Sequence, residues 1–131
     1  MIGIPSFVKI ETPEAPGAVG PYSQAIQTGG MIYVSGQLPL DPATMEFAAD
    51  DVPGQTAQCL KNAAAILQKA GSGLDRVVKV SVWMTDLGQF TVMNTVYADF
   101  FSEPFPARVC CQVAALPRGA QVEIEMIALA D

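Results

Sequence analysis

The chain has no histidine, only seven lysine and arginine residues, and three cysteines among its 131 residues. Without histidine, proton transfer near neutral pH falls to carboxylates, hydroxyls, the backbone and water. A zinc site would need Asp, Glu and Cys alone. The basic residues are scattered along a chain of net charge −6, and phosphate binding needs a basic face. The composition therefore argues against a metal site and against a nucleic-acid partner.

The cysteines are Cys59, Cys110 and Cys111, an odd number with no CxxC spacing. Because adjacent residues of a strand point to opposite faces, Cys110 and Cys111 can neither share a metal ion nor readily form a disulfide. We expect all three thiols to be small apolar fillers in a reducing compartment.

Long apolar runs are also missing, since no segment approaches the ~20 residues needed to span a bilayer. The segment Met1 to Pro16 has no basic region followed by an apolar region, so we expect a cytoplasmic protein without a membrane partner. The length suits one domain, residues 1–131. Half of the residues are hydrophobic and only 15% are charged, which predicts that partner subunits cover part of the surface.

Hydrophobic periodicity predicts six strands and two helices. The strands are expected near residues 7–11 and over 22–27, 31–35, 77–84, 108–114 and 121–129, and the helices over about 50–71 and 86–100. The Gly29-Gly30 connection predicts a tight hairpin in which Ile26 faces Tyr33 and Gln24 faces Ser35.

The order of these elements predicts an α+β sandwich, a mixed sheet with two helices on one face. Residues 77–84 form its most apolar strand, with Val78, Val80, Val82 and Met84 expected on one face and Val77 and Trp83 on the other. Two helices cannot also hide Val77, Trp83, Ile127 and Leu129. The far face of the sheet is therefore the expected subunit interface, and the second helix should direct Phe90, Met93, Val96, Tyr97 and Phe100 inward.

Five motifs in order resemble the RidA/YjgF/L-PSP family, the reactive intermediate deaminases. They are Gly20-Pro21-Tyr22-Ser23-Gln24-Ala25, Val34-Ser35-Gly36-Gln37, Phe105-Pro106-Ala107-Arg108, Leu116-Pro117 and Val122-Glu123-Ile124-Glu125. The resemblance spans essentially the whole chain. It implies a chorismate-mutase-like (YjgF-like) fold, a homotrimer with a central sheet barrel, and active sites in the clefts between subunits. It also implies hydrolysis of 2-imino and enamine acids, such as 2-iminobutanoate and 2-iminopropanoate, to 2-oxo acids and ammonia, with no cofactor.

Arg108 and Glu123 are the predicted catalytic residues. A planar guanidinium can hold the substrate carboxylate by two parallel hydrogen bonds, which suits Arg108. In the family pattern, Glu123 orients the attacking water. Without that pattern, Arg108 is better explained as a surface residue or half of a salt bridge, and Glu123 and Glu125 as a solvated stripe. Ile127 and Leu129 share the expected face of that stripe, which argues against the second explanation.

Four further residues are predicted to bind substrate from the resemblance alone. It implies that Tyr22 lines the pocket, that Ser35 and the backbone at Gly36 contact the ligand, and that the backbone around Cys110 faces it. Tyr22 and Ser35 are also explained by cross-strand packing, and Cys110 by filling of the core.

A simple hairpin of the last two strands would separate Arg108 from Glu123 by ~17 Å along the strand, too far for one small pocket. We therefore expect that the two strands are not neighbours, or that the site is completed across a subunit boundary. Two other functions stay open: an L-PSP-type endoribonuclease or translation inhibitor, and a noncatalytic metabolite-binding or chaperone-like trimer. The acidic charge and the absence of histidine weigh against RNA cleavage.

Overall fold

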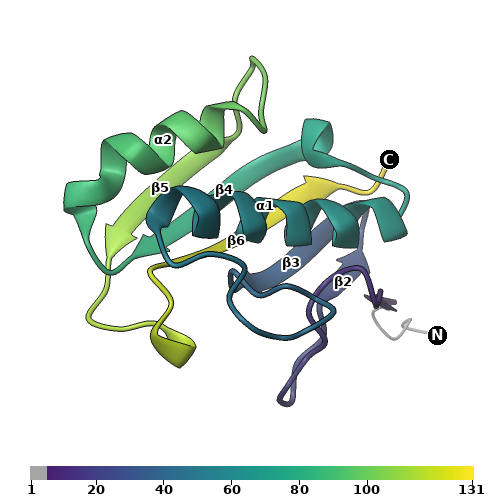
Figure 1. The fold of residues 1–131 in the computed structure, drawn as a ribbon. Helices are drawn as coiled ribbons and strands as arrows, with labels where there is room; N and C mark the ends of the chain where they lie inside the picture. Colours follow the sequence, from purple (N-terminus) through teal and green to yellow (C-terminus); the bar gives the residue numbers. More distant parts are fainter. Residues whose placement is uncertain (1–5) are drawn as a thin grey trace.

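The computed structural model describes residues 6–131 as a six-stranded sheet with both helices on one face (Figure 1). Along the sheet the strand order is β1-β2-β3-β6-β4-β5, and only the β4–β5 pair is parallel. The strands are β1 (Val8–Ile10), β2 (Ala25–Thr28), β3 (Met31–Gln37), β4 (Val77–Met84), β5 (Ala107–Gln112) and β6 (Val122–Leu129), and the helices are α1 (Val52–Lys69) and α2 (Phe90–Ala98). The predicted order of elements and the α+β class are confirmed.

The hairpin of β2 and β3 has the predicted register. Ile26 pairs with Tyr33, and the backbone N–H of Ser35 donates to the carbonyl of Gln24 at 2.9 Å. Gly29 and Gly30 have φ angles of +57° and +80°, which a two-residue turn between twisted strands requires.

The helices begin and end near the predicted residues. The Asp51 carboxylate caps α1 by accepting from the Gly54 N–H at 3.0 Å, and a turn over Leu87–Gln89 precedes α2. Between residues 6 and 131, neither helix has the length and apolarity that a membrane span requires. The expectation that no targeting leader is present rests on the segment Met1 to Pro16. The first five residues of that segment lie outside the described residues.

The two helices cover one face of the sheet and leave the other face without a helix. In β6, Val122, Ile124, Met126 and Ala128 are buried beneath the helices, whereas Glu123, Glu125, Ile127 and Leu129 point to the opposite face. That second face carries no helix, and large apolar side chains stay accessible on it, among them Tyr33 (46% exposed) and Val109 (42%). The expected uncovered apolar face is therefore present.

The prediction for the start of β4 is wrong. Val77 is buried in the core and Val78 is exposed, the reverse of the expected arrangement. The β4–β6 pairing shifts register between Val77 and Lys79, and the extra residue reverses the alternation of side chains between faces. Val80, Val82 and Met84 occupy the helix-covered face as predicted.

Two further predictions about burial need correction. Phe90 is 37% exposed rather than inward, because α2 begins at this residue and its ring lies at the helix end, beside Arg108. All three cysteines are free thiols, but only Cys59 is a fully buried filler. Cys111 is exposed because it lies on the uncovered face of β5, level with Trp83.

One buried amide fixes the chain that leaves β3. Asn62 of α1 is 1% exposed, and its Nδ2 donates to the carbonyls of Leu38 and Leu40 at 3.1 and 2.9 Å. Its Oδ1 accepts from the Gln58 amide at 2.8 Å. The helix thereby satisfies two backbone acceptors in a segment that, among the described residues, has the single bridge of Leu40 to Phe47 in place of a strand ladder.

We predict that Asn62→Ala lowers the free energy of unfolding by about 2 to 4 kcal/mol, because it removes the donor to the Leu40 carbonyl, leaves the Leu38 carbonyl with the Leu40 N–H alone, and opens a small cavity. Lys61→Ala, an exposed position one residue earlier, should change stability by less than about 0.5 kcal/mol. Urea denaturation followed by circular dichroism measures both. Equal effects of the two substitutions would show that these hydrogen bonds add nothing to stability.

Candidate functional site

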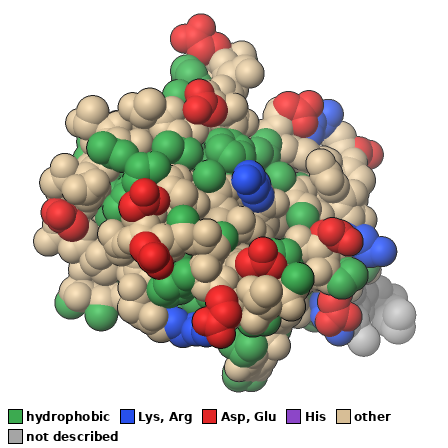
Figure 2. Space-filling view, in the orientation of Figure 1, with side chains coloured by type: hydrophobic (Ala, Val, Ile, Leu, Met, Phe, Trp, Pro, Cys, Tyr) green, Lys and Arg blue, Asp and Glu red, His purple; other side chains and the backbone are tan. Residues whose placement is uncertain are grey.

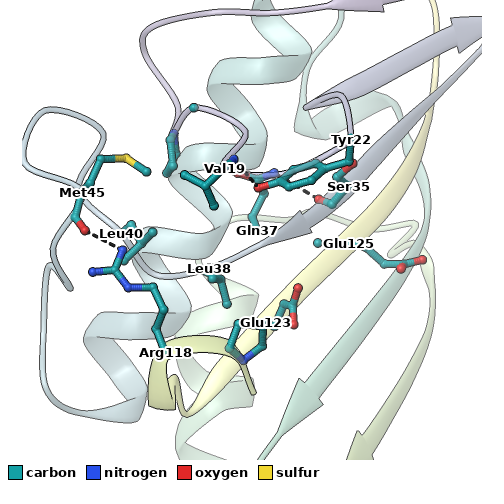
Figure 3. A pocket seen from close by; sticks show the side chains of 14 residues that line it. Val19, Tyr22, Ser35, Gln37, Leu38, Leu40, Met45, Arg118, Glu123 and Glu125 are labelled. Atoms are coloured by element: carbon teal, nitrogen blue, oxygen red, sulfur yellow. Dashed lines mark hydrogen bonds between the residues drawn. The ribbon is translucent and has the colours of Figure 1, made fainter. Parts of the chain in front are cut away.

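A cavity of about 490 Å³, called the larger cavity below, opens at the end of β3 on the uncovered side of the sheet (Figure 3). Its walls come from the loop before β2, the end of β3 and the segment that follows it, the turn at Pro117 and Arg118, and β6. Four of the predicted site residues line it: Tyr22, Ser35, Gly36 and Glu123. The structure therefore brings these four together within one chain.

Gly36 lies directly against Glu123. A Cβ atom at this position would collide with the Glu123 carboxylate, so a larger residue would displace that side chain from its present position. The β3–β6 pairing is irregular between Val34 and Gln37, and this bulge sets Gly36 beside β6. The absence of a side chain at Gly36 is thus part of how the carboxylate is placed.

Ser35 and Tyr22 form the wall next to Gly36. The Ser35 hydroxyl donates to the carbonyl of Ser23 at 2.6 Å, so its proton is engaged and its oxygen can still accept. The Tyr22 ring lies across the mouth of the cavity (Figure 3), and its hydroxyl oxygen accepts a long hydrogen bond, 3.5 Å, from the Val19 N–H. Both hydroxyls therefore have capacity left for a ligand.

Glu123 and Glu125 both line the cavity; the Glu123 carboxylate lies within it beside Gly36, whereas the Glu125 side chain extends toward its edge (Figure 3). Within residues 6–131, the Glu123 side chain forms no hydrogen bond or ion pair. Burial raises the pKa of Glu123, and the nearby negative charge of Glu125 raises it further. A half-buried carboxylate of this kind holds a proton more tightly than one in water, which suits a group that exchanges protons with substrate or water.

Arg108 lies in a different hollow, of about 340 Å³, lined also by Asn94, Tyr97, Phe105 and Pro106. Its guanidinium carbon is 4.7 Å from the centroid of the Tyr97 ring and 5.6 Å from that of Phe90. Among residues 6–131 it has no hydrogen-bond acceptor and no acidic partner. The guanidinium is held by stacking on aromatic rings, so its hydrogen-bond donors remain available.

The Tyr97 hydroxyl beside Arg108 is buried without a hydrogen-bond partner among the described residues. Burial raises its pKa, and the positive charge of Arg108 opposes that rise. Asn94 precedes Tyr97 by three residues on α2 and lines the same hollow. Sequence reasoning missed Asn94, although the spacing of three from a predicted inward tyrosine places it on nearly the same side of the helix.

Arg108 and Glu123 do not meet within one chain. Strand β4 lies between β5 and β6, so the last two strands are not neighbours, as one of the two expectations held. Arg108 is level with Val80 on the helix-covered face, and Glu123 is level with Trp83 on the opposite face. The two side chains are thus on opposite sides of the sheet, two strands apart and ~10 Å apart along the strand direction.

Cys110 lines neither the larger cavity nor the hollow of Arg108, although it lies on the same face of β5 as Arg108, two residues along the strand. It shares the helix-covered face of β5, and its Sγ is 3.8 Å from the Met84 Sδ. Burial raises the pKa of the Cys110 thiol, although Arg108 acts in the opposite direction, so the thiolate is disfavoured. Within residues 6–131, His, Cys, Asp and Glu side chains form no group of three that could hold a metal ion.

A second arginine lines the larger cavity and was not predicted as a site residue. Arg118 donates from Nη1 to the carbonyl of Met45 at 2.8 Å (Figure 3). Its residue type gave no signal for this role, and its position depends on a left-handed backbone, with φ +61°, that arginine seldom adopts.

Comparison with known proteins identifies relatives along most of the chain. The family model described as Endoribonuclease L-PSP matches residues 12–130. The RutC family protein y4sK of Sinorhizobium fredii is 57% identical over 118 residues, covering 90% of this chain and 94% of that protein. The human protein named 2-iminobutanoate/2-iminopropanoate deaminase is 43% identical over 120 residues, covering 92% of this chain and 88% of that one.

A solved structure has the same fold. RidA from the Antarctic bacterium Psychrobacter sp. superimposes with a TM-score of 0.90 at 48% sequence identity, covering 93% of this chain and 98% of that one. The resemblance inferred from the five motifs is confirmed. The chain belongs to the endoribonuclease L-PSP family, which is also the RidA/YjgF family.

Proposed function

We propose that the protein is a homotrimeric deaminase that hydrolyses small 2-imino and enamine acids, such as 2-iminobutanoate and 2-iminopropanoate, to 2-oxo acids and ammonia. The observation that carries the proposal is the guanidinium of Arg108, which is fixed by two aromatic rings but has no acidic partner among the described residues. The name of the human relative supports the same reaction. Ammonia release from enzymatically generated 2-iminobutanoate is the direct test.

The two halves of the site come from different subunits in this proposal. Arg108 and Glu123 lie on opposite faces of one sheet, so a single molecule cannot apply both to one small substrate. The uncovered face carries Tyr33, Val109 and Leu129, each more than a third exposed. Burial of that face against neighbouring copies stabilises the assembly and brings Arg108 of one subunit to the cavity of the next.

Arg108 binds the substrate carboxylate in the proposed complex. Its planar guanidinium donates two parallel hydrogen bonds to the two carboxylate oxygens, and stacking on Tyr97 fixes the plane of the fork. Because the rings exclude water from one side, the charge-assisted bonds are stronger than at an open surface. The anchor sets the distance of the imine carbon from the opposite wall.

Glu123 then directs the chemistry at the imine carbon. Ionised Glu123 accepts a hydrogen bond from a water, and the water oxygen forms a bond to the electrophilic iminium carbon while one of its protons passes to the carboxylate. The C=N π electrons move to nitrogen. Protonated Glu123 returns that proton to the amine, and the C–N bond breaks with its electron pair leaving on nitrogen. The hydroxyl proton passes to the Glu123 carboxylate as the C=O bond forms, which gives the 2-oxo acid and ammonia, and Glu123 then releases the proton to water. No step needs a cofactor.

Tyr22, Ser35 and the backbone at Gly36 complete the ligand contacts in the same cavity, and the backbone at Cys110 lies on the side of Arg108. The Ser35 oxygen accepts from the protonated imine nitrogen, since its own proton is engaged with Ser23. Tyr22 closes the mouth and limits the entry of bulk water.

Nucleic acid fits the surface poorly. On the face seen in Figure 2, lysine and arginine side chains lie singly among acidic ones, and the net charge is −6. RNA binding relies on a continuous basic surface that neutralises several phosphates. A noncatalytic carboxylate-binding trimer is the stronger rival, and it differs from the deaminase by binding without turnover.

We predict a homotrimer in solution, with a mass of about three times 13.8 kDa. Val109→Lys should shift it toward monomer, because a lysine would be buried on the uncovered sheet face. Val92→Lys, a 40% exposed position on α2, is the matched control and should leave the trimer intact. Size exclusion with light scattering measures both. A monomeric parent protein would contradict the shared site.

Substitution of Arg108 should remove activity without dissociating the trimer. We expect Arg108→Ala to lower kcat/KM by about a hundredfold or more, since it removes a charged, hydrogen-bonded anchor. Arg108→Lys should recover little, because an ammonium cannot reproduce two parallel hydrogen bonds. Near-native turnover of the Ala variant would make Arg108 a structural residue.

The two carboxylates of β6 should respond differently to removal of charge. Glu123→Gln is expected to lower kcat by about a hundredfold with little change in the Kd of 2-oxobutanoate, because it removes the proton transfer and not the anchor. Glu125→Gln removes a negative charge that raises the pKa of Glu123. The acid limb of the rate profile should therefore move to lower pH, since ionised Glu123 persists further into acid. Equal losses of kcat at both positions would contradict this assignment.

A further inference from the structure

Two non-glycine residues with positive φ angles face each other at the larger cavity. Among residues 6–131, Met45 (φ +60°) and Arg118 (φ +61°) are the non-glycine residues in this region of backbone space. The region is unfavourable for side chains with a Cβ, and it persists where surrounding contacts hold it. Here the contact joins the two residues themselves, because Arg118 Nη1 donates to the Met45 carbonyl at 2.8 Å (Figure 3).

Met45 belongs to a loop, residues 41–46, that is ordered mainly by its own hydrogen bonds. The N–H of Asp41 donates to the Glu46 carbonyl and the N–H of Met45 to the Asp41 carbonyl, both at 2.8 Å. Leu40 and Phe47 pair across its neck. In the described part of the chain, Arg118 supplies the hydrogen bond that ties this loop to a distant segment, and its Nη2 lies 4.0 Å from the Glu46 carboxylate.

The cavity has a polar end and an apolar end. Ser35, Gly36 and Glu123 form the polar end, whereas Leu38, Leu40 and Met45 line the apolar part together with the stem of Arg118. The donors of Arg118 are directed to the loop, so the stem of this side chain, rather than its charge, faces a ligand. A substrate with its imine carbon beside Glu123 gains by burying its alkyl group at the apolar end.

We propose that the hydrogen bond from Arg118 to Met45 holds residues 41–46 as a fixed wall and thereby limits the length of the substrate side chain. The inference rests on the proposed function for the class of ligand, a 2-imino acid or its 2-oxo product. Arg118 acts through the loop and is a positioning residue. When this hydrogen bond is removed, the wall can move outward and longer alkyl groups can enter.

The test compares Arg118→Gly, Arg118→Lys and Lys9→Ala. Glycine removes the donor but adopts φ +61° readily, so this variant retains a favourable backbone at the turn. Lysine keeps one donor in reach of the Met45 carbonyl and should restore much of the hydrogen bonding. Lys9 forms an exposed ion pair with Glu11 at 3.9 Å and lines none of the cavity walls, which makes Lys9→Ala the matched control for removal of a charge.

Two measurements report on the loop over residues 41–46 without requiring imine hydrolysis. Calorimetry gives the ratio of Kd values for 4-methyl-2-oxopentanoate and 2-oxopropanoate, and hydrogen exchange gives the protection of the Asp41 and Met45 amides. In Arg118→Gly we expect the Kd of 4-methyl-2-oxopentanoate to fall about tenfold relative to that of 2-oxopropanoate, because the longer acid gains room. Hydrogen exchange should become faster at both amides. Arg118→Lys should lie near the parent protein, and Lys9→Ala should match it.

An unchanged Kd ratio in Arg118→Gly would overturn the inference, whether or not exchange becomes faster, since the loop would then not limit the ligand. Failure of the parent protein to bind either 2-oxo acid would overturn it as well. If the ratio shifts as expected while no imine is hydrolysed, the wall is supported and the proposed deaminase activity alone fails.

Discussion

Strand β4 pairs with β5 on one side and with β6 on the other, and this central position decides where every proposed catalytic group can act. The two-residue period of the strands then sends Arg108 and Glu123 to opposite faces, because they are level with Val80 and Trp83. One chain therefore cannot bring both groups to one small molecule, and the proposed function has a second copy supply one of them. In that proposal, assembly through the uncovered face and catalysis depend on each other.

Several polar groups at the two hollows lack a hydrogen-bond partner among the described residues, as do Thr56 Oγ1 and Arg76 Nε elsewhere. Asn62 and Gln24 are buried with several hydrogen bonds each, whereas the Tyr97 hydroxyl is buried with none among the described residues. Arg108 is held by stacking on aromatic rings, and Glu123 carries a raised pKa. Leaving polar groups without partners costs free energy, and in the proposed function the substrate supplies the missing hydrogen bonds. The rigid frame around them, from the Asn62 amide to the glycine at position 36, holds the groups in place.

Much of the fold was predictable from the sequence because periodicity and turn chemistry are local. The Gly29-Gly30 turn determined the hairpin register, and alternation along β6 identified Glu123 and Glu125 on the open face. The order of strands was not predictable in this way, since β4 enters between β5 and β6 by long-range pairing. The bulge that buries Val77 and the left-handed backbone of Met45 and Arg118 could not be predicted from the residue types at those positions. Of the site, the residues were found through family motifs, whereas their division between two hollows came only from the topology.

The shared site is tested most directly by mixing two inactive subunits. Coexpression of the Arg108→Ala and Glu123→Gln chains produces mixed trimers in which an intact Arg108 meets an intact Glu123 at some interfaces. With random assembly, about one site in four receives both intact groups, so we expect recovery of roughly a quarter of the parent deaminase activity. Mixed trimers, verified by mass, that stay as inactive as either variant alone would show that the two residues do not act in one site.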